Sequence, residues 1–207
     1  DVIRRQRQMC IRDRAITLAA CSSGPKQPDS VDITLEPTQS VQNYMIQADS
    51  TEGSLQNDWL IMASKAAIQA NEFDQAELLL KRLSRQQLTD VQQAEWQLTR
   101  ATLKQKQGNY QQLLQELNFQ PWWKLPTEQW KDYYSLRADA FQSLHKPFDA
   151  NRQLVALSQY SSPSEQAAIS SRIWMNFASY SEYELTSLRT EASEDVLDGW
   201  LQLAIYA

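Results

Sequence analysis

Residues 57–83 have the sequence NDWLIMASKAAIQANEFDQAELLLKRL, and this stretch decides the fold. Apolar residues recur in it at spacings of three and four, first within 59–70 and then within 76–83. Such spacing places apolar side chains on one face of an α-helix. Asn71 and Glu72 separate the two stripes. The stretch therefore predicts two helices joined by a short turn.

The same unit recurs twice further along the chain, at turns that contain Gln107-Gly108-Asn109 and His145-Lys146-Pro147. An aromatic residue follows each of the three turns, a second aromatic lies fourteen positions before it, and bulky or apolar residues lie seven positions to either side. The matching sets are Phe73, Tyr110 and Phe148; Trp59, Trp96 and Tyr134; Ala66, Leu103 and Phe141; and Leu80, Leu117 and Val155. The spacing, 37 and then 38 residues, is slightly longer than that of a tetratricopeptide repeat.

A helical hairpin cannot bury both of its apolar faces alone, so neighbouring hairpins stack and share a core. The aromatic after each turn is expected to lie within its own hairpin, and the aromatic fourteen positions earlier to pack against the preceding hairpin. Glycine occurs only four times and no proline lies between Thr38 and Gln120, which favours helix over sheet. We therefore predict an all-α, tetratricopeptide-like superhelix over residues 38–207, incomplete at its C-terminal end because the chain stops within an apolar helix.

The segment before the helices carries a short motif of bacterial lipoproteins. Leu18-Ala19-Ala20-Cys21 resembles the signal at which a cysteine becomes the lipidated N-terminus. We predict Cys21 as the lipid attachment site, 21–37 as a flexible lipoprotein tether and 1–20 as a signal-peptide remnant. A signal peptide needs an apolar segment of about 7 to 15 residues, which 1–20 lacks, so we interpret its beginning as artefactual sequence. One alternative is a chance match to the motif in a cytosolic protein. Another is that the five arginines at positions 4, 5, 7, 12 and 14 form a nucleic-acid-binding arm.

Composition argues against catalysis and against binding to nucleic acid. The formal charge is -5, and an acidic surface repels phosphates, so no nucleic-acid partner is expected. Cys10 and Cys21 are the only cysteines, and the only histidine is His145, at a predicted turn. The sequence therefore lacks the residues that a metal site, a nucleophilic triad or a glycine-rich phosphate loop would need. We predict no cofactor, no metal and no enzymatic activity, and no stretch is apolar over the roughly 18 to 20 residues of a membrane-spanning helix.

The segment 120–126, with the sequence QPWWKLP, interrupts the helical pattern. Two adjacent tryptophans cannot both face the same core from a helix, and the flanking prolines hold the segment out of regular structure. One hypothesis is an exposed aromatic platform in which Trp122 and Trp123 contact a partner or the rings of a glycan. The alternative is that one or both tryptophans cover the hydrophobic end of the second hairpin.

Three stretches carry a family resemblance: 57–63 (NDWLIMA), 75–79 (QAELL) and 193–203 (SEDVLDGWLQL). With the cysteine motif, they resemble the LpoA family of outer-membrane lipoproteins, which activate a class A penicillin-binding protein. The resemblance implies a non-catalytic, lipid-anchored protein on the periplasmic face of the outer membrane that regulates peptidoglycan synthesis. Its implied partners are the penicillin-binding protein, the outer membrane through the lipid, and peptidoglycan. In the family a second, C-terminal domain makes the main contact with the synthase, so this chain would supply the anchor and a helical spacer or docking arm.

Two other functions compete with this interpretation. The first is a generic tetratricopeptide-like periplasmic lipoprotein, for example one that assists outer-membrane protein assembly, because such repeats present a groove for a peptide. The second is a glycan hydrolase that uses paired carboxylates, for which Glu182 with Glu184, or Glu191 with Glu194, are the nominal candidates. These glutamates lie in polar stretches, which favours a surface role over an enzymatic one.

Overall fold

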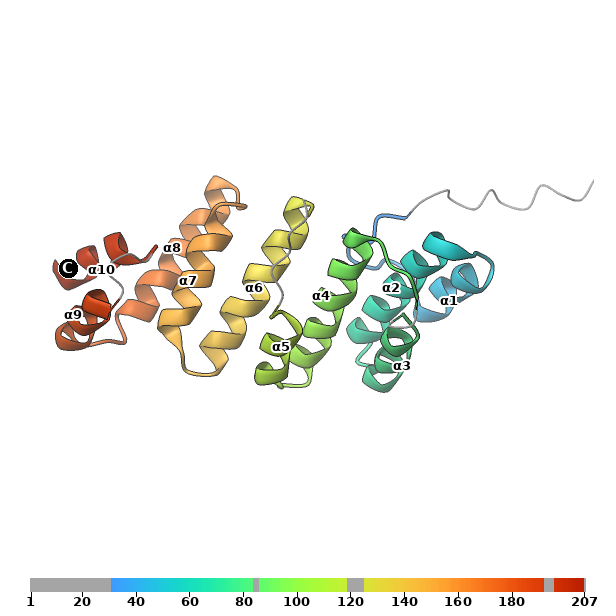
Figure 1. Ribbon diagram of the computed structural model, residues 1–207, viewed down its shortest axis with the longest axis horizontal. Helices are drawn as coiled ribbons and strands as arrows, with labels where there is room; N and C mark the ends of the chain where they lie inside the picture. The colour runs from blue at the N-terminus through green and yellow to red at the C-terminus, as the bar shows by residue number, and fades with distance from the viewer. Residues whose placement is uncertain (1–30, 84–85, 119–124, 192–195, 207) are drawn as a thin grey trace, which may run out of the picture. The chain divides into compact units, whose positions relative to one another are not determined.

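In a computed structural model of the chain, the structure describes residues 31–83, 86–118, 125–191 and 196–206. The chain divides into two compact units, 1–30 and 31–207, and all of the described residues belong to the second. Within the described ranges the regular secondary structure is α-helical, without a strand (Figure 1). The prediction of an all-α fold is confirmed. None of the helices in these ranges is long and apolar enough to cross a membrane.

Three helical hairpins form the regular part of the structure, and the two helices of each run antiparallel (Figure 1). The first helix of each hairpin has 17 residues, and the three first helices begin at 53, 90 and 127, which are 37 residues apart. The hairpins are α2 (Gly53–Gln69) with α3 (Phe73–Leu83), α4 (Asp90–Lys106) with α5 (Tyr110–Glu116), and α6 (Thr127–Ser143) with α7 (Pro147–Ser158). This regular spacing identifies the repeat as a structural one.

The turn inside each hairpin has the same backbone conformation. Asn71, Gly108 and His145 have φ angles of 60°, 71° and 56°, the left-handed region in which a helix commonly ends. In each case the next residue donates its backbone N–H to a carbonyl five residues earlier, at 2.8, 2.8 and 2.9 Å. These bonds satisfy a carbonyl that the end of the first helix leaves free. His145 thus ends α6 through its backbone, and its side chain is exposed.

The structure corrects the register that the sequence predicted for the third copy. With the turns 37 residues apart, the position equivalent to Trp96 is Tyr133, and Tyr133 is 8% exposed whereas Tyr134 is only partly buried. The polar contacts agree, because Trp96 Nε1 donates to the Leu80 carbonyl at 2.9 Å and Tyr133 Oη donates to the Leu117 carbonyl at 3.2 Å. Pro147 occupies the first position of α7, which suits its missing N–H and moves the aromatic residue one position further along.

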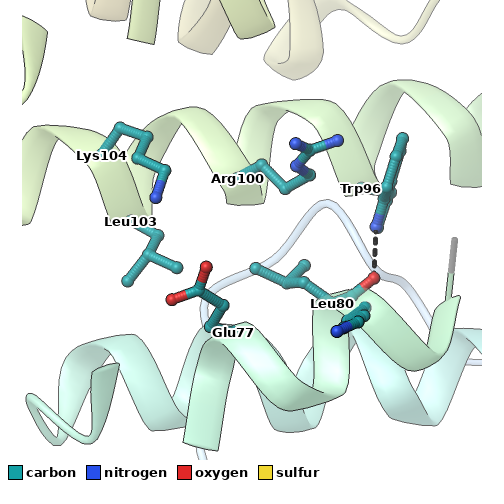
Figure 2. Close-up of a pocket in the computed structure, with 7 residues that line it drawn as sticks. Glu77, Leu80, Trp96, Arg100, Leu103 and Lys104 are labelled. Carbon is teal, nitrogen blue, oxygen red and sulfur yellow. Dashed lines mark hydrogen bonds between the residues drawn. The ribbon is translucent and has the colours of Figure 1, made fainter. Parts of the chain in front are cut away.

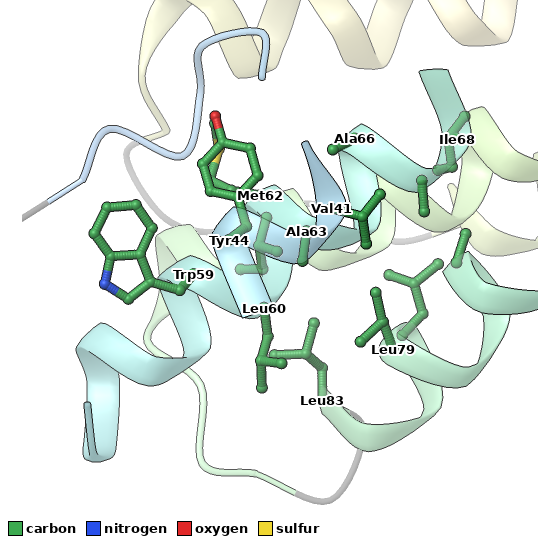
Figure 3. Packing of buried hydrophobic residues seen from close by; sticks show 14 of the residues in the cluster. Val41, Tyr44, Trp59, Leu60, Met62, Ala63, Ala66, Ile68, Leu79 and Leu83 are labelled. Atoms are coloured by element: carbon green, nitrogen blue, oxygen red, sulfur yellow. The ribbon is translucent and has the colours of Figure 1, made fainter. Parts of the chain in front are cut away.

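The buried residues of the first hairpin form a core with α1 (Val41–Asp49) (Figure 3). Tyr44 of α1 lies against Trp59 of α2, with ring centroids 6.1 Å apart, and both are almost fully buried. The contribution of α3 is Ala76, Leu79, Leu80 and Leu83, of which Figure 3 labels Leu79 and Leu83. Two further clusters of buried residues follow, one joining α4, α5 and α6 and the next joining α6 and α7 to the helices after them. Stacked hairpins with shared cores are what the repeat predicted.

The residues just before α1 contact the helices. Ile33 is 5% exposed, and the Lys65 ammonium of α2 donates to the carbonyls of Ile33 and Leu35, both at 3.0 Å. The sequence placed 31–37 at the end of the predicted tether, but this part of the chain is bonded to the helical repeat. The rest of the predicted tether, and the whole of 1–20, lie outside the described residues.

The last three helices depart from the regular repeat, as the looser sequence pattern indicated. They are α8 (Pro163–Phe177), α9 (Glu182–Glu191) and α10 (Asp198–Tyr206). α8 begins 36 residues after α6, and it packs against α7, whereas α9 packs mainly against α10. Trp174 of α8 and Trp200 of α10 meet with ring centroids 5.2 Å apart. α10 begins later than the start that the sequence predicted near Ser193, which itself lies outside the described residues.

Candidate functional site

The first helices of the three hairpins form a groove of about 430 Å³, which we call the α2–α4–α6 groove. Glu36, from the segment before α1, also lines it. Its other polar lining residues include Lys65, Glu95, Thr102, Asp132, Ser135 and Asp139. A pocket of this size with convergent polar groups is the default candidate for a binding site.

The repeat register explains why these side chains meet. Glu95 and Asp132 are each the sixth residue of their helix, and Thr102 and Asp139 are each the thirteenth. Seven residues are about two turns of helix, so the two positions face the same way. Hairpins stacked in register therefore place a row of acidic residues beside a second polar row. The corresponding residues of α2 are Asp58 and Lys65.

Buried glutamines hold two of the three acidic residues. Gln92 of α4 donates through Nε2 to Asp58 at 2.6 Å, and Gln129 of α6 donates through Nε2 to Glu95 at 2.8 Å. The two glutamines are 37 residues apart, and each also donates to a backbone carbonyl of the preceding first helix. Both are almost fully buried, where an amide needs such partners. α4 thus donates a hydrogen bond to the carboxylate of α2, and α6 donates one to the carboxylate of α4.

Glu95 links the first, second and third hairpins. Its Oε1 accepts from the Lys65 ammonium at 2.9 Å, and its Oε2 accepts from Gln129. The side chain of Glu95 is 3% exposed and that of Lys65 is 13% exposed, so this ion pair is largely removed from solvent. A buried carboxylate is tolerated only where donors of this kind surround it.

Asp132, the third member of the acidic row, differs from the other two. It has no hydrogen bond to another described residue. The third residue of α8, at the position of Gln92 and Gln129, is Glu165, whose carboxylate cannot donate a bond. Gln166, the fourth residue, donates to the carbonyls of Ser158 and Ser161. The residue is exposed at the groove wall. Partial loss of hydration there, together with the charge of Glu95, raises the pKa of Asp132 to about 6, against an opposing effect of Lys65. At neutral pH Asp132 therefore presents an unpaired negative charge to the groove.

Asp139 lies in the groove on the same face of α6, seven residues beyond Asp132. Its carboxylate accepts from Arg172 of α8 at 2.8 Å and from Gln105 of α4 at 3.3 Å. Both side chains of the Asp139–Arg172 ion pair are more than a third exposed. Asp139 is therefore already paired, in contrast to Asp132.

A second pocket, of about 330 Å³, lies between α3 and α4 (Figure 2). Trp96 lines it, and the guanidinium of Arg100 lies 4.6 Å from the centre of the Trp96 ring and bonds to Glu116 at 2.6 Å. The next hairpin repeats the arrangement, because Arg137 lies 5.3 Å from the centre of the Tyr133 ring and bonds to Gln153. Because the arrangement of arginine and aromatic ring recurs in successive hairpins, we interpret it as part of the packing of the repeat. We therefore do not treat this pocket as a candidate binding site.

The structure does not bear on the site residues that the sequence singled out. Cys21, Trp122 and Trp123 all lie outside the described residues. Glu184 accepts bonds from the backbone and hydroxyl groups of Ser181, which lower its pKa and place it at the start of α9. The spacing of apolar residues in the sequence does not reveal the groove. The 37-residue spacing of Asp58, Glu95 and Asp132 was the available signal.

Three hairpins in register, with a polar groove between their first helices, define the chain as a tetratricopeptide-like helical-repeat scaffold. A family model described as "LppC putative lipoprotein" matches residues 34–207. The chain belongs to this family.

Known relatives agree with this assignment. The chain is 81% identical over 193 residues to the penicillin-binding protein activator LpoA of Vibrio antiquarius, and 66% identical over 192 residues to that of Vibrio vulnificus. Each match covers 93% of this chain and 32% of the relative, so the chain spans about a third of these proteins.

Among solved structures, the E. coli LpoA amino-terminal domain matches with a TM-score of 0.65 at 24% identity, covering 83% of this chain and 76% of that one. LpoA of Haemophilus influenzae matches with a TM-score of 0.57 at 18% identity, covering 84% of this chain and 32% of that one. These two likenesses concern the fold.

Proposed function

We propose that this chain is the anchored helical part of an activator of a class A penicillin-binding protein, and that it regulates peptidoglycan synthesis without catalysis. The observation that carries the proposal is the 81% identity, across 93% of the chain, to a protein named as such an activator. The match of the family model to residues 34–207 supports it. The role is one of placing a partner, which suits a scaffold of stacked hairpins.

Successive segments of the chain have different proposed roles. Residues 1–20 are a leader remnant, Cys21 carries the lipid that holds the protein at the periplasmic face of the outer membrane, and 21–37 lead into the repeat. Residues 38–207 act as spacer and docking arm towards peptidoglycan, with Trp122 and Trp123 available to a partner or glycan. The main contact with the synthase belongs to the part of the relatives' length that this chain does not match.

The anchor can be tested by labelling. The chain is expressed in E. coli behind a lipoprotein leader joined at Cys21, with an alkyne-tagged palmitate in the medium. We expect label in the outer-membrane fraction for the parent and none for Cys21→Ser, while Cys10, ahead of the cleavage point, is absent from the mature protein. Equal labelling of the two proteins would show that Cys21 is not the attachment site.

The spacer role can be tested by deleting the helical part from a full-length relative. In the LpoA of Vibrio antiquarius, the region matching residues 38–207 is removed while the anchor is kept. We expect the shortened protein to stimulate the penicillin-binding protein in detergent solution, where reach is irrelevant, and to fail in cells. Full function in cells would contradict the spacer proposal. Loss of stimulation in solution would instead place the contact itself in the helical part.

A capture experiment separates the activator from the alternative scaffold role. The same full-length relative, tagged, is purified from detergent-solubilised envelopes beside a control lipoprotein. We expect enrichment of a class A penicillin-binding protein. Its absence, with outer-membrane assembly proteins enriched in its place, would favour the assembly role.

A further inference from the structure

We propose that the α2–α4–α6 groove binds an extended peptide segment that carries a lysine or arginine side chain, and that Asp132 receives this cation. The inference goes beyond the proposed function and does not depend on it. It concerns a surface of the chain that the match to activator relatives does not explain.

The repeat leaves Asp132 without the partner that its equivalents have. Asp58 and Glu95 occupy the same helix position as Asp132, and each accepts a hydrogen bond from a buried glutamine at the third position of the next first helix. Asp132 lacks that bond, because the third residue of α8 is Glu165, whose carboxylate cannot donate. A position that is paired in two repeats is therefore open in the third, where it faces the groove. The Asp132 carboxylate, which no donor among the described residues reaches, can therefore accept a hydrogen bond from a ligand.

The charge of the groove favours a cation. Four carboxylates line it, those of Glu36, Glu95, Asp132 and Asp139, against two lysines, and Arg172 of α8 already pairs with Asp139. One of the lysines, Lys65, already serves three acceptors, namely Glu95 and two backbone carbonyls. The charge near Asp132 is therefore not neutralised from within the described residues. Complementary charge on a ligand would relieve the repulsion between neighbouring carboxylates.

The lining of the groove suits a peptide better than a bare ion. Leu98 and Leu136 line it beside the acidic residues, and Ser135 adds a hydroxyl that can bond to a peptide. The hydroxyl of Thr102 already donates to the Leu98 carbonyl. An aliphatic stem with a charged end can use the apolar and the acidic surface at once. The described residues contain no group of three side chains that could hold a metal ion. The volume of about 430 Å³ admits a few residues of a chain.

The test is a titration of the ¹⁵N-labelled 207-residue chain with short probes, followed by amide chemical shifts. The probe is acetyl-Ala-Ala-Lys-Ala-Ala-amide. Its comparator replaces lysine by norleucine, which keeps the stem and removes only the ammonium. We expect saturable shifts at amides around Asp132 with the lysine peptide. Loss of one exposed charge pair is worth about 1 kcal/mol, which corresponds to about fivefold weaker binding. We expect this loss both when Asp132→Asn binds the lysine peptide and when the parent binds the norleucine peptide.

The control variant is Asp74→Asn, which removes the same charge from α3, away from the groove, and should bind like the parent. Equal binding of the lysine and norleucine peptides, or by Asp132→Asn, would overturn the proposal. So would equal affinity for lysine methyl ester, which would indicate a site for a cation and not for a peptide. The spectra also report the fold of each variant, and Asp132→Glu, which keeps the charge, should retain binding. None of these assays involves a penicillin-binding protein, so failure here leaves the proposed function untouched.

Discussion

The interface between α4 and α6 and the interface between α6 and α8 join successive first helices by different means. The former contains a buried hydrogen bond between Gln129 and Glu95, reinforced by Lys65. The latter contains two ion pairs with partly exposed side chains, Lys131–Glu165 at 3.2 Å and Arg172–Asp139 at 2.8 Å. The spacing between the helices falls from 37 to 36 residues at the same point.

The residue at the third position of the following first helix therefore sets the chemistry of the contact. In α4 and α6 this residue is a glutamine, which donates to the acid of the preceding first helix. In α8 it is Glu165, and ion pairs with partly exposed side chains make the polar contact with α6. Exposed ion pairs contribute little to stability, whereas a buried carboxylate that loses a donor is costly. Glu165 at this position also leaves Asp132 open to the groove.

The largest difference is expected between two lysine substitutions. Lys65→Met removes the cation from buried Glu95 and the donor from two carbonyls, and should lower the free energy of unfolding by about 3 kcal/mol. Lys131→Met breaks the exposed pair with Glu165 and should have no measurable effect. Urea unfolding followed by circular dichroism measures both. Similar losses in the two variants would contradict the distinction between the interfaces.

A smaller difference is expected between two glutamines that are 37 residues apart in the sequence, Gln129 and Gln166. Gln129→Leu leaves Glu95 with one donor fewer and should cost about 2 kcal/mol, whereas Gln166→Leu loses only bonds to exposed turn carbonyls and should cost about 0.5 kcal/mol. The same unfolding experiment compares them. If Gln166→Leu proved the more damaging, the capped turn and not the buried bond would hold the repeat.

Asp132→Asn should stabilise the protein. The pKa of Asp132 is raised from 3.8 to about 6, so the folded state binds the proton more tightly and stability falls as pH rises between these values. Above pH 6 the full cost of the charge is present, and below 3.8 it is gone. Because the residue is exposed, we expect a gain of about 1 kcal/mol at pH 7.5. Unfolding at pH 7.5 and 3.5 should show the gain only at the higher pH, and a gain at both would contradict this origin.

Two of the turns should show effects of opposite sign. Gly108 has φ +71° with open space around an added Cβ, so Gly108→Ala should cost about 1 kcal/mol through backbone strain alone. His145→Gly removes such strain from the third turn and should gain about 0.5 kcal/mol. Thermal unfolding measures both. A loss in His145→Gly would show that the histidine side chain contributes beyond the turn.

The sequence predicted the hairpins and their approximate spacing, because apolar side chains must recur along a helix that is buried on one face. It missed the register of the third copy by one residue. The prediction followed the aromatic Phe148, whereas the fixed point is the left-handed turn at His145. A proline after that turn displaced the aromatic.

The groove was harder to predict, since it depends on which polar residues pair across hairpins. Gln129 and Gln166 are 37 residues apart, but they are the third residue of α6 and the fourth residue of α8, and they make different bonds. A shift of one residue is within the uncertainty of a helix boundary read from sequence. The predicted roles of Cys21, Trp122 and Trp123 stay predictions.

A double-mutant cycle on Glu95→Gln and Gln129→Leu, with a parallel cycle on Glu165→Gln and Lys131→Met, tests the central claim most directly. The claim is that a buried hydrogen bond joins α4 to α6, whereas the ion pairs between α6 and α8 are partly exposed and weak. Coupling in the first cycle is predicted at about 1.5 kcal/mol, and the second should show none that can be measured. Equal coupling in the two cycles, or none in the first, would contradict it.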